Sequence, residues 1–273
     1  MQDVWSNAKL NEWLSKSNED KAIFPEVPII DPHHHVFPAA QLSDDAFESV
    51  RRSSRTQTLL RTFRRAPILG YTEEYWKKDA EKVLVAATVY VEAHVRYDNS
   101  QIFPELGEVL FARRLHELNS PAFCRGIIAR IDLSLPEPDI RQRIESYRAA
   151  LVKSSCVLSG VRFQLAQHPD FLSSTRPSDL SVNCYAGARV LGSLGIILDI
   201  WLYSHQILEL VDLAKNAPQT LIVCDHVGTP ISANPRVFED WKRNMLSLAQ
   251  CDNVIVKLGK YDDMKPVHLT KLC

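Results

Sequence analysis

The sequence lacks an excess of charge of either sign, because 32 Lys and Arg residues stand against 33 Asp and Glu residues and the formal net charge is −1. Such a balance creates no field that would gather a nucleic-acid backbone or an anionic membrane surface, so neither is expected as a partner. The N-terminus lacks a basic segment followed by an apolar run, and no apolar stretch approaches the roughly 20 residues that a membrane span needs. We therefore expect a cytoplasmic protein.

Paired cysteines are lacking as well. The six cysteines are scattered singly, with no Cys-x-x-Cys pair and without the density of a small secreted scaffold. We interpret them as reduced thiols, an interpretation that agrees with the expected cytoplasmic location.

The length and hydrophobic content predict one large core. At 273 residues and 45% hydrophobic content, a single (β/α)8 barrel of about 250 residues matches the chain, although two small domains would also fit. Short apolar runs recur, each followed by a stretch long enough for a crossover helix, which is typical of a parallel sheet. The expected strands are residues 27–35, 83–92, 126–133, 158–165, 196–203, 220–226 and 253–258.

The chain offers fewer strands than a closed barrel requires. Seven are countable where eight are needed, and the segment after Gly259 is polar with no strand-like run. We predict an α/β chain of the (β/α)8 type, a single domain over residues 1–273 with its core at about 27–260, an atypical tail at 260–273, and the C-terminal strand and helices missing. The Arg-rich and Ser-rich insert at about 41–82 is either a cap over the barrel or a solvated helical insertion.

Three consecutive histidines end the first expected strand. Because side chains alternate across a strand, Asp31, His33 and His35 should leave it on one face and His34 on the other. At the C-terminal end of a barrel strand, two imidazoles two residues apart could hold one divalent cation or one substrate oxygen. The alternative is a polar strand end without a chemical role.

These residues resemble a known family. Asp31-Pro32-His33-His34-His35 is similar to the Asp-x-His-x-His opening of the amidohydrolase superfamily. Further family-like motifs, in the order of the family's strands, are Thr88 to Ala93, Gly160 to Arg162, Leu198 to Tyr203, Asp225 to Pro230 and Asn253 to Gly259. Their combination over about residues 27–260 resembles the amidohydrolase-related (amidohydrolase 2) family, in its lactonase-like branch of 2-pyrone-4,6-dicarboxylate lactonase and L-fuconolactonase-like enzymes.

The resemblance implies a hydrolase in which water opens a lactone, or another cyclic ester or amide, of a small carboxylated molecule. His33 and His35 match the first-strand pair, which ligates a divalent metal such as zinc or, in metal-free lactonases of the branch, donates hydrogen bonds to the scissile carbonyl. His226 matches the sixth-strand histidine that polarises the substrate or orients water. The alternative for His226 is a core histidine that ends an apolar strand, but the Val-Gly-Thr-Pro sequence after it favours a site.

Two further residues are candidates for substrate binding. Arg162 could clamp a substrate carboxylate with its planar fork, or it could pair with a neighbouring acid such as Asp132 or Glu92. Glu92 shares a strand face with His94, so it could line the mouth of the barrel or pair with that histidine.

The sequence also departs from the family pattern. The fifth strand ends with Asp199 and Trp201 instead of a histidine, and His205 follows too late to replace it. The general base that the family places on its eighth strand has no counterpart, and Asp262 and Asp263 lie in the tail. The alternative function is therefore a catalytically impaired, truncated isoform that forms a homo-oligomer through its open barrel edge.

Overall fold

The computed structural model describes residues 25–36, 84–168, 182–230 and 234–259. The expected insert at 41–82 and the tail that contains Asp262 and Asp263 lie outside these residues. No described helix combines the length and apolar character that crossing a bilayer demands.

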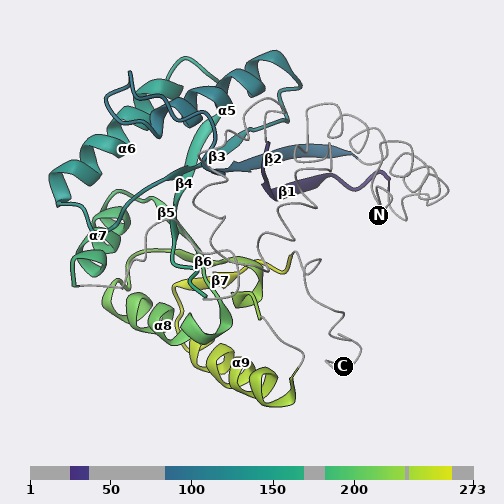
Figure 1. Cartoon of the computed structure of the whole chain (residues 1–273). Helices are drawn as coiled ribbons and strands as arrows, with labels where there is room; N and C mark the ends of the chain where they lie inside the picture. The colour runs from purple at the N-terminus through teal and green to yellow at the C-terminus, as the bar shows by residue number, and fades with distance from the viewer. Residues whose placement is uncertain (1–24, 37–83, 169–181, 231–233, 260–273) are drawn as a thin grey trace, which may run out of the picture. The chain divides into compact units, whose positions relative to one another are not determined.

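The described elements alternate between strands and helices (Figure 1). The strands are β1 (Ile29–His34), β2 (Val85–Val91), β3 (Gly126–Arg130), β4 (Val157–Gln164), β5 (Ile197–Trp201), β6 (Ile222–Cys224) and β7 (Val254–Val256). The helices are α5 (Leu106–Leu118), α6 (Glu137–Leu151), α7 (Val182–Ser193), α8 (Ile207–Asn216) and α9 (Pro235–Leu248), with short 3-10 turns at η1 (Ser204–Gln206) and η2 (Asp225–Gly228).

All seven expected strands are present, and each ends within a few residues of its expected bounds. Their order in the sheet follows the sequence from β1 to β7, and the described pairings are parallel. The prediction of a (β/α)8-type chain with seven of its eight strands is therefore confirmed for the described residues.

The chain divides into two compact units. Unit 1 comprises Met1–Ala129 and Ser146–Leu158, and unit 2 comprises Arg130–Glu145 and Ser159–Cys273. In unit 1, β1 pairs with β2 and β2 with β3; in unit 2, β4, β5, β6 and β7 pair in succession.

The packing within unit 1 includes a buried histidine that joins three segments. His116 of α5 donates from Nδ1 to the carbonyl oxygen of Phe123 over 2.8 Å. That bond fixes the tautomer, so the hydroxyl of Ser155 donates to Nε2 over 2.6 Å. The imidazole thereby ties α5 to the segment before β3 and to the segment before β4.

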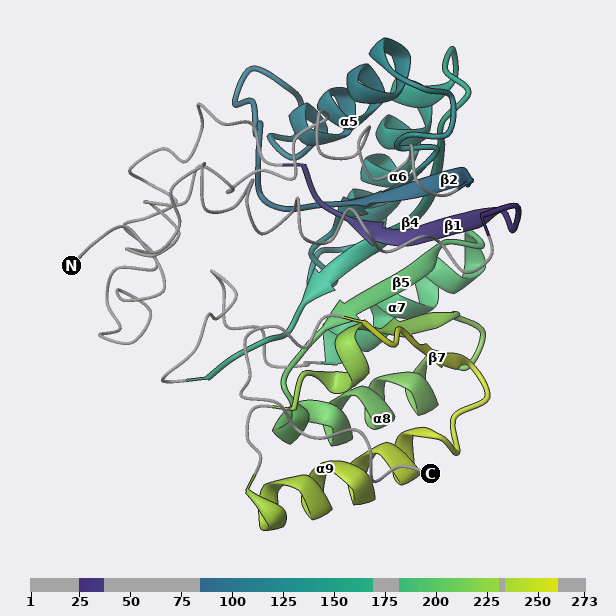
Figure 2. The same cartoon turned by 90° about the vertical axis from the view of Figure 1, so that its right-hand side faces the viewer.

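In unit 2, the strands are covered by amphipathic helices. Helices α8 and α9 lie side by side (Figure 2), and the side of α8 that faces inward carries Leu210 and Leu213, both fully buried. Gly187 of α7 allows close packing, because a Cβ there would lie 2.3 Å from the carbonyl oxygen of Leu133.

Candidate functional site

The histidine pair of the first strand lies as the alternation predicts. Nε2 of His33 and Nε2 of His35 are 3.2 Å apart, and Nδ1 of His35 is 2.8 Å from the carbonyl oxygen of Val91. A carbonyl oxygen can only accept, so Nδ1 of His35 carries the hydrogen and its Nε2 presents a lone pair. The backbone N–H of His33 donates to the Asp31 carboxylate over 3.0 Å, which holds the start of the motif.

His34, on the opposite face of β1, anchors the strand in the core. Its Nε2 is 2.8 Å from the hydroxyl of Thr88, and its ring stacks on Phe123 with centroids 5.1 Å apart. Burial lowers the pKa of His34 to about 4, although the charge of Asp31 acts in the opposite direction. The middle histidine is thus a neutral core group, and its packing presents His33 and His35 on the other face.

Glu92 follows β2 and is only 1% exposed. Its Oε2 accepts from the backbone N–H of His94 over 3.3 Å and lies 3.7 Å from Nε2 of the same residue. The contact between Glu92 and His94, one of the two alternatives from the sequence, is therefore present. Contact of Glu92 with a substrate stays a prediction.

Glu108 of α5 is a buried carboxyl that the sequence analysis did not single out. Its Oε1 accepts from the hydroxyl of Tyr90 and from the backbone N–H of Ala93, both over 2.7 Å. Burial, reinforced by the charge of Glu92, raises the pKa of Glu108 to about 8. The sequence feature that could have identified Glu108 is an acid on the apolar face of an amphipathic helix, where Val109 and Ala112 are also buried.

Arg162 lies in a buried cluster of charges in unit 2. It is 4% exposed, donates from Nε to Asp199 Oδ1 over 2.6 Å, and bonds through Nη2 to Asp225. The alternative that Arg162 pairs with an acid is therefore what the structure shows, with Asp199 and Asp225 as partners. Binding of a substrate carboxylate by Arg162 stays a prediction.

Lys257, directly after β7, completes this cluster. Its Nζ is 2.6 Å from Asp199 Oδ2 and 3.3 Å from Asp225 Oδ1. Two carboxylates and two cations thus balance each other, which is the condition under which charges are tolerated in a protein interior. Lys257 is 17% exposed and both acids are at most 1% exposed.

The backbone that carries His226 differs from the expectation. The sequence places His226 at the end of a strand, but β6 ends at Cys224 and His226 lies in the turn η2. His226 has φ 51° and ψ 40°, and Val227 has φ 54° and ψ 31°. Both are in the left-handed region, which a β-branched residue such as valine rarely adopts. A turn of this kind redirects the chain directly beyond the buried Asp225.

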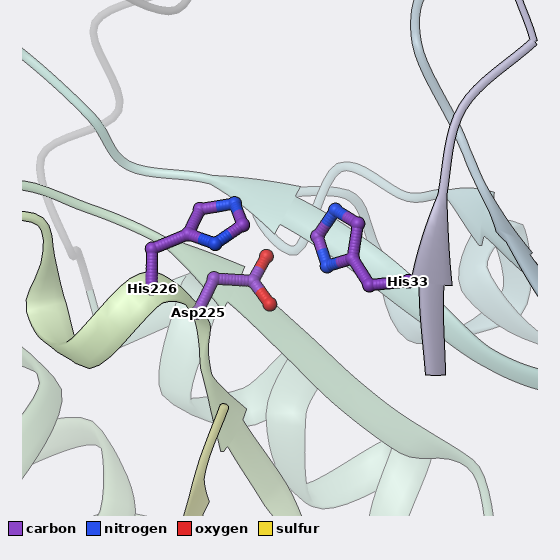
Figure 3. Close-up of side chains that lie close together, drawn as sticks. All are labelled: His33, Asp225 and His226. Atoms are coloured by element: carbon purple, nitrogen blue, oxygen red, sulfur yellow. The ribbon is translucent and has the colours of Figure 1, made fainter. Parts of the chain in front are cut away.

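Figure 3 draws three side chains whose atoms are typical metal ligands: the imidazole of His33, at β1, and the carboxylate and imidazole of Asp225 and His226, after β6. His33 belongs to unit 1 and the other two belong to unit 2. Among the residues expected from the sequence, this set contains His33 and His226. Asp225 was quoted there only as part of a family-like motif.

Comparisons with known proteins identify the family. The family model described as "Amidohydrolase" matches residues 30–267. An uncharacterized protein of Sinorhizobium fredii, y4mH, is 35% identical over 73 residues, which are 27% of this chain and 24% of that protein, so the aligned region covers about a quarter of the relative.

Two solved structures share the fold. A crystal structure of an amidohydrolase from Burkholderia multivorans with bound zinc has a TM-score of 0.59 at 18% identity, covering 85% of this chain and 69% of the other. Amidohydrolase 2 from Bifidobacterium longum subsp. infantis has a TM-score of 0.51 at 17% identity, covering 86% and 74%. Because the family model spans most of the sequence and these folds agree with it, the chain belongs to the amidohydrolase family.

Proposed function

We propose that the protein is a hydrolase that opens a lactone, or another cyclic ester or amide, of a small carboxylated molecule. The observation that carries this proposal is the pair of imidazole nitrogens of His33 and His35, 3.2 Å apart, with the tautomer of His35 set by Val91. Such a pair can bind an electrophile from one side, and membership of the amidohydrolase family supports a hydrolytic role for it.

A zinc ion fits these donors. Two nitrogens bound to one tetrahedral zinc at about 2.0–2.1 Å lie roughly 3.3 Å apart, close to the observed separation of 3.2 Å. The bond from Nδ1 of His35 to a carbonyl oxygen is the outer-shell contact that metal-binding histidines usually make. We propose His33 and His35, both of unit 1, as ligands of this ion. When bound, zinc would polarise the scissile carbonyl and lower the pKa of a water molecule.

A metal-free mechanism uses the same residues differently. With the lone pair of His35 Nε2 facing His33, the protonated nitrogen of His33 donates to His35 and the pair forms one hydrogen-bonded unit. Protonation of that unit would free an N–H for the scissile carbonyl. His226 would then orient water from its turn after β6, and zinc stoichiometry separates this mechanism from the first.

The charged cluster refines the expected role of Arg162. A substrate carboxylate would have to compete with Asp199 and Asp225 for the guanidinium, and both acids are buried with it. Lys257 belongs to the same cluster and is more exposed than Arg162. We propose that these two cations together make the surroundings of Asp225 favourable for an anionic substrate.

The test combines activity with metal content. Purified protein is assayed against a panel of carboxylated and uncarboxylated lactones with and without zinc, and bound zinc is measured by elemental analysis. His33→Asn and His226→Asn should each lower kcat/KM by at least 100-fold, whereas His205→Asn, a change at an exposed histidine, should keep it within about 2-fold. Equal activity in all three variants, or no hydrolysis of any lactone by the wild type, would overturn the proposal.

Association between copies is a second candidate. Within the described residues β7 pairs only with β6, and Ile255 of β7 is 51% exposed. A strand with an open edge and an exposed apolar side chain can pair with another chain. We propose a homo-oligomer through this edge; sedimentation of wild type and Ile255→Lys would show a mass decrease in the variant, and a monomeric wild type would exclude it.

A further inference from the structure

The turn that carries His226 contains an unusual run of backbone conformations. His226, Val227, Gly228 and Thr229 have φ values of 51°, 54°, 68° and 35°, all in the left-handed region. Only glycine adopts this region freely, and a β-branched residue is strongly disfavoured there. Such a run persists only where surrounding contacts hold it, and residues of this kind concentrate at functional sites.

The peptide groups of Val227 are held on both sides. The backbone N–H of Val227 donates to the carbonyl oxygen of Lys257 over 3.1 Å, and the indole Nε1 of Trp241 donates to the carbonyl oxygen of Val227 over 2.8 Å. Trp241 is on α9 and is 8% exposed. A buried indole N–H needs an acceptor, and here the acceptor is the carbonyl of a β-branched residue in the left-handed region.

The rest of the turn is fixed by its neighbours. The N–H of Thr229 donates to the carbonyl oxygen of His226 over 2.8 Å, and the N–H of Ser204 donates to the carbonyl oxygen of Thr229 over 3.3 Å. Gly228 lies against Ile207, because a Cβ at that position would be 2.8 Å from its Cδ1. Contacts from α9, from the end of β7 and from η1 with α8 thus meet at four residues.

We propose that Trp241 is a positioning residue for His226: its indole N–H holds the carbonyl of Val227 and so keeps the left-handed turn in the conformation that directs the His226 imidazole. In this role Trp241 acts through the backbone of Val227, the residue after His226. Without the bond, Val227 can relax toward ordinary φ values, and the Cα–Cβ direction of His226 changes with it. The inference rests on the proposed function only for its effect on catalysis.

The test removes the N–H and keeps an aromatic side chain at position 241. Trp241→Phe is compared with Phe238→Leu. Phe238 is on the same helix, with its ring centroid 5.1 Å from that of Trp241, so this change alters an aromatic neighbour but leaves the hydrogen bond of the indole intact. If Trp241→Phe is too unstable to fold, benzothienylalanine at position 241 replaces the N–H by sulfur at nearly the same shape. Hydrogen exchange of the Val227 and Thr229 amides is measured together with steady-state kinetics.

In Trp241→Phe, or with benzothienylalanine, exchange of these amides should rise at least 10-fold relative to the β5 amides, and kcat should fall at least 10-fold with KM within 2-fold. Phe238→Leu should leave the exchange rates of these amides and kcat within 2-fold of the wild-type values. Asparagine tolerates the left-handed region, so adding Val227→Asn to Trp241→Phe should restore part of the protection of these amides from exchange. Unchanged exchange overturns the inference, and so does altered exchange with unchanged kcat. If the wild type hydrolyses no lactone, the proposed function fails and the exchange data alone decide the role of Trp241.

Discussion

Arg162 and Asp199 are register neighbours on β4 and β5, and Nε of Arg162 donates to Oδ1 of Asp199 over 2.6 Å. In a parallel sheet, neighbours in register place their side chains on the same face, so this contact follows directly from the strand pairing. Asp225 and Lys257 extend it to the ends of β6 and β7. The four charges therefore link β4 and β5 to the residues directly after β6 and β7 in unit 2.

Replacing Arg162 should destabilise the protein strongly. Arg162→Met leaves Asp199 and Asp225 buried beside Lys257 without the guanidinium, and loss of one partner from a buried ion cluster costs about 3–5 kcal/mol. Urea unfolding measures the free energy of unfolding of Arg162→Met against that of the wild type and of Arg162→Lys, which keeps a positive charge. A loss below about 1 kcal/mol in Arg162→Met would show that the acids are solvated or protonated instead.

Lys257 should matter less than Arg162, because it is 17% exposed and Arg162 is 4% exposed. We expect Lys257→Met to lower the free energy of unfolding by about 1–3 kcal/mol. The matched control is Lys215→Met, which removes an exposed lysine of α8. It should change the free energy of unfolding by less than about 0.5 kcal/mol. Equal effects of the two lysine variants would contradict a role for Lys257 in the cluster.

Replacing Gly228 tests the left-handed turn through the free energy of unfolding, without an activity assay. Gly228→Ala combines a positive φ of 68° with a contact of 2.8 Å to Ile207 Cδ1, so we expect a loss of about 2–4 kcal/mol. Gly195 has a similar φ of 65° but nothing within 4 Å of its Cβ position, so Gly195→Ala should lose only about 1 kcal/mol. Thermal and urea unfolding of the two variants separate backbone strain from steric contact; equal losses would argue against close packing at Gly228.

Glu108 should make stability fall as the pH rises. Its pKa of about 8 in the folded chain lies above the ordinary value of 4.5, so the folded state binds more protons than the unfolded state between these values. Stability from this group is therefore full below about pH 4.5 and is lost as the pH rises through about 8. The loss should be on the order of 3–5 kcal/mol.

Urea unfolding at pH 5.5, 7 and 8.5 measures this effect. Glu108→Gln resembles the protonated acid and should reduce the pH dependence, while Glu117→Gln, at an exposed position of the same helix, should not. The prediction is wrong if the wild type and Glu108→Gln show the same slope.

Several features could be derived from the sequence because they depend on local periodicity. The seven apolar runs indicated seven strands. Apolar residues at helical spacing, Ile140, Ile144, Tyr147 and Leu151, likewise form the buried face of α6. Alternation along one strand was enough to place His33 and His35 together and His34 opposite. In each case the information lies within fewer than about twenty consecutive residues.

The sequence could not choose the partner of Arg162, because Asp199 and Asp225 are 37 and 63 positions away. The register of β4 against β5 brings Asp199 beside it, and the pairing of β5 with β6 brings Asp225, which directly follows β6.

The sequence by itself determined the (β/α)8 class, the positions of the seven strands along the chain and the paired imidazoles of His33 and His35, since strand periodicity and side-chain alternation are local properties. Only the tertiary structure decided that Arg162 is balanced by Asp199 and Asp225, that Glu108 is buried beside Tyr90, and that His226 lies in a left-handed turn bonded to Trp241. These features depend on which distant segments pack against each other, and the free energy of that packing overrides the conformation that each residue would adopt alone.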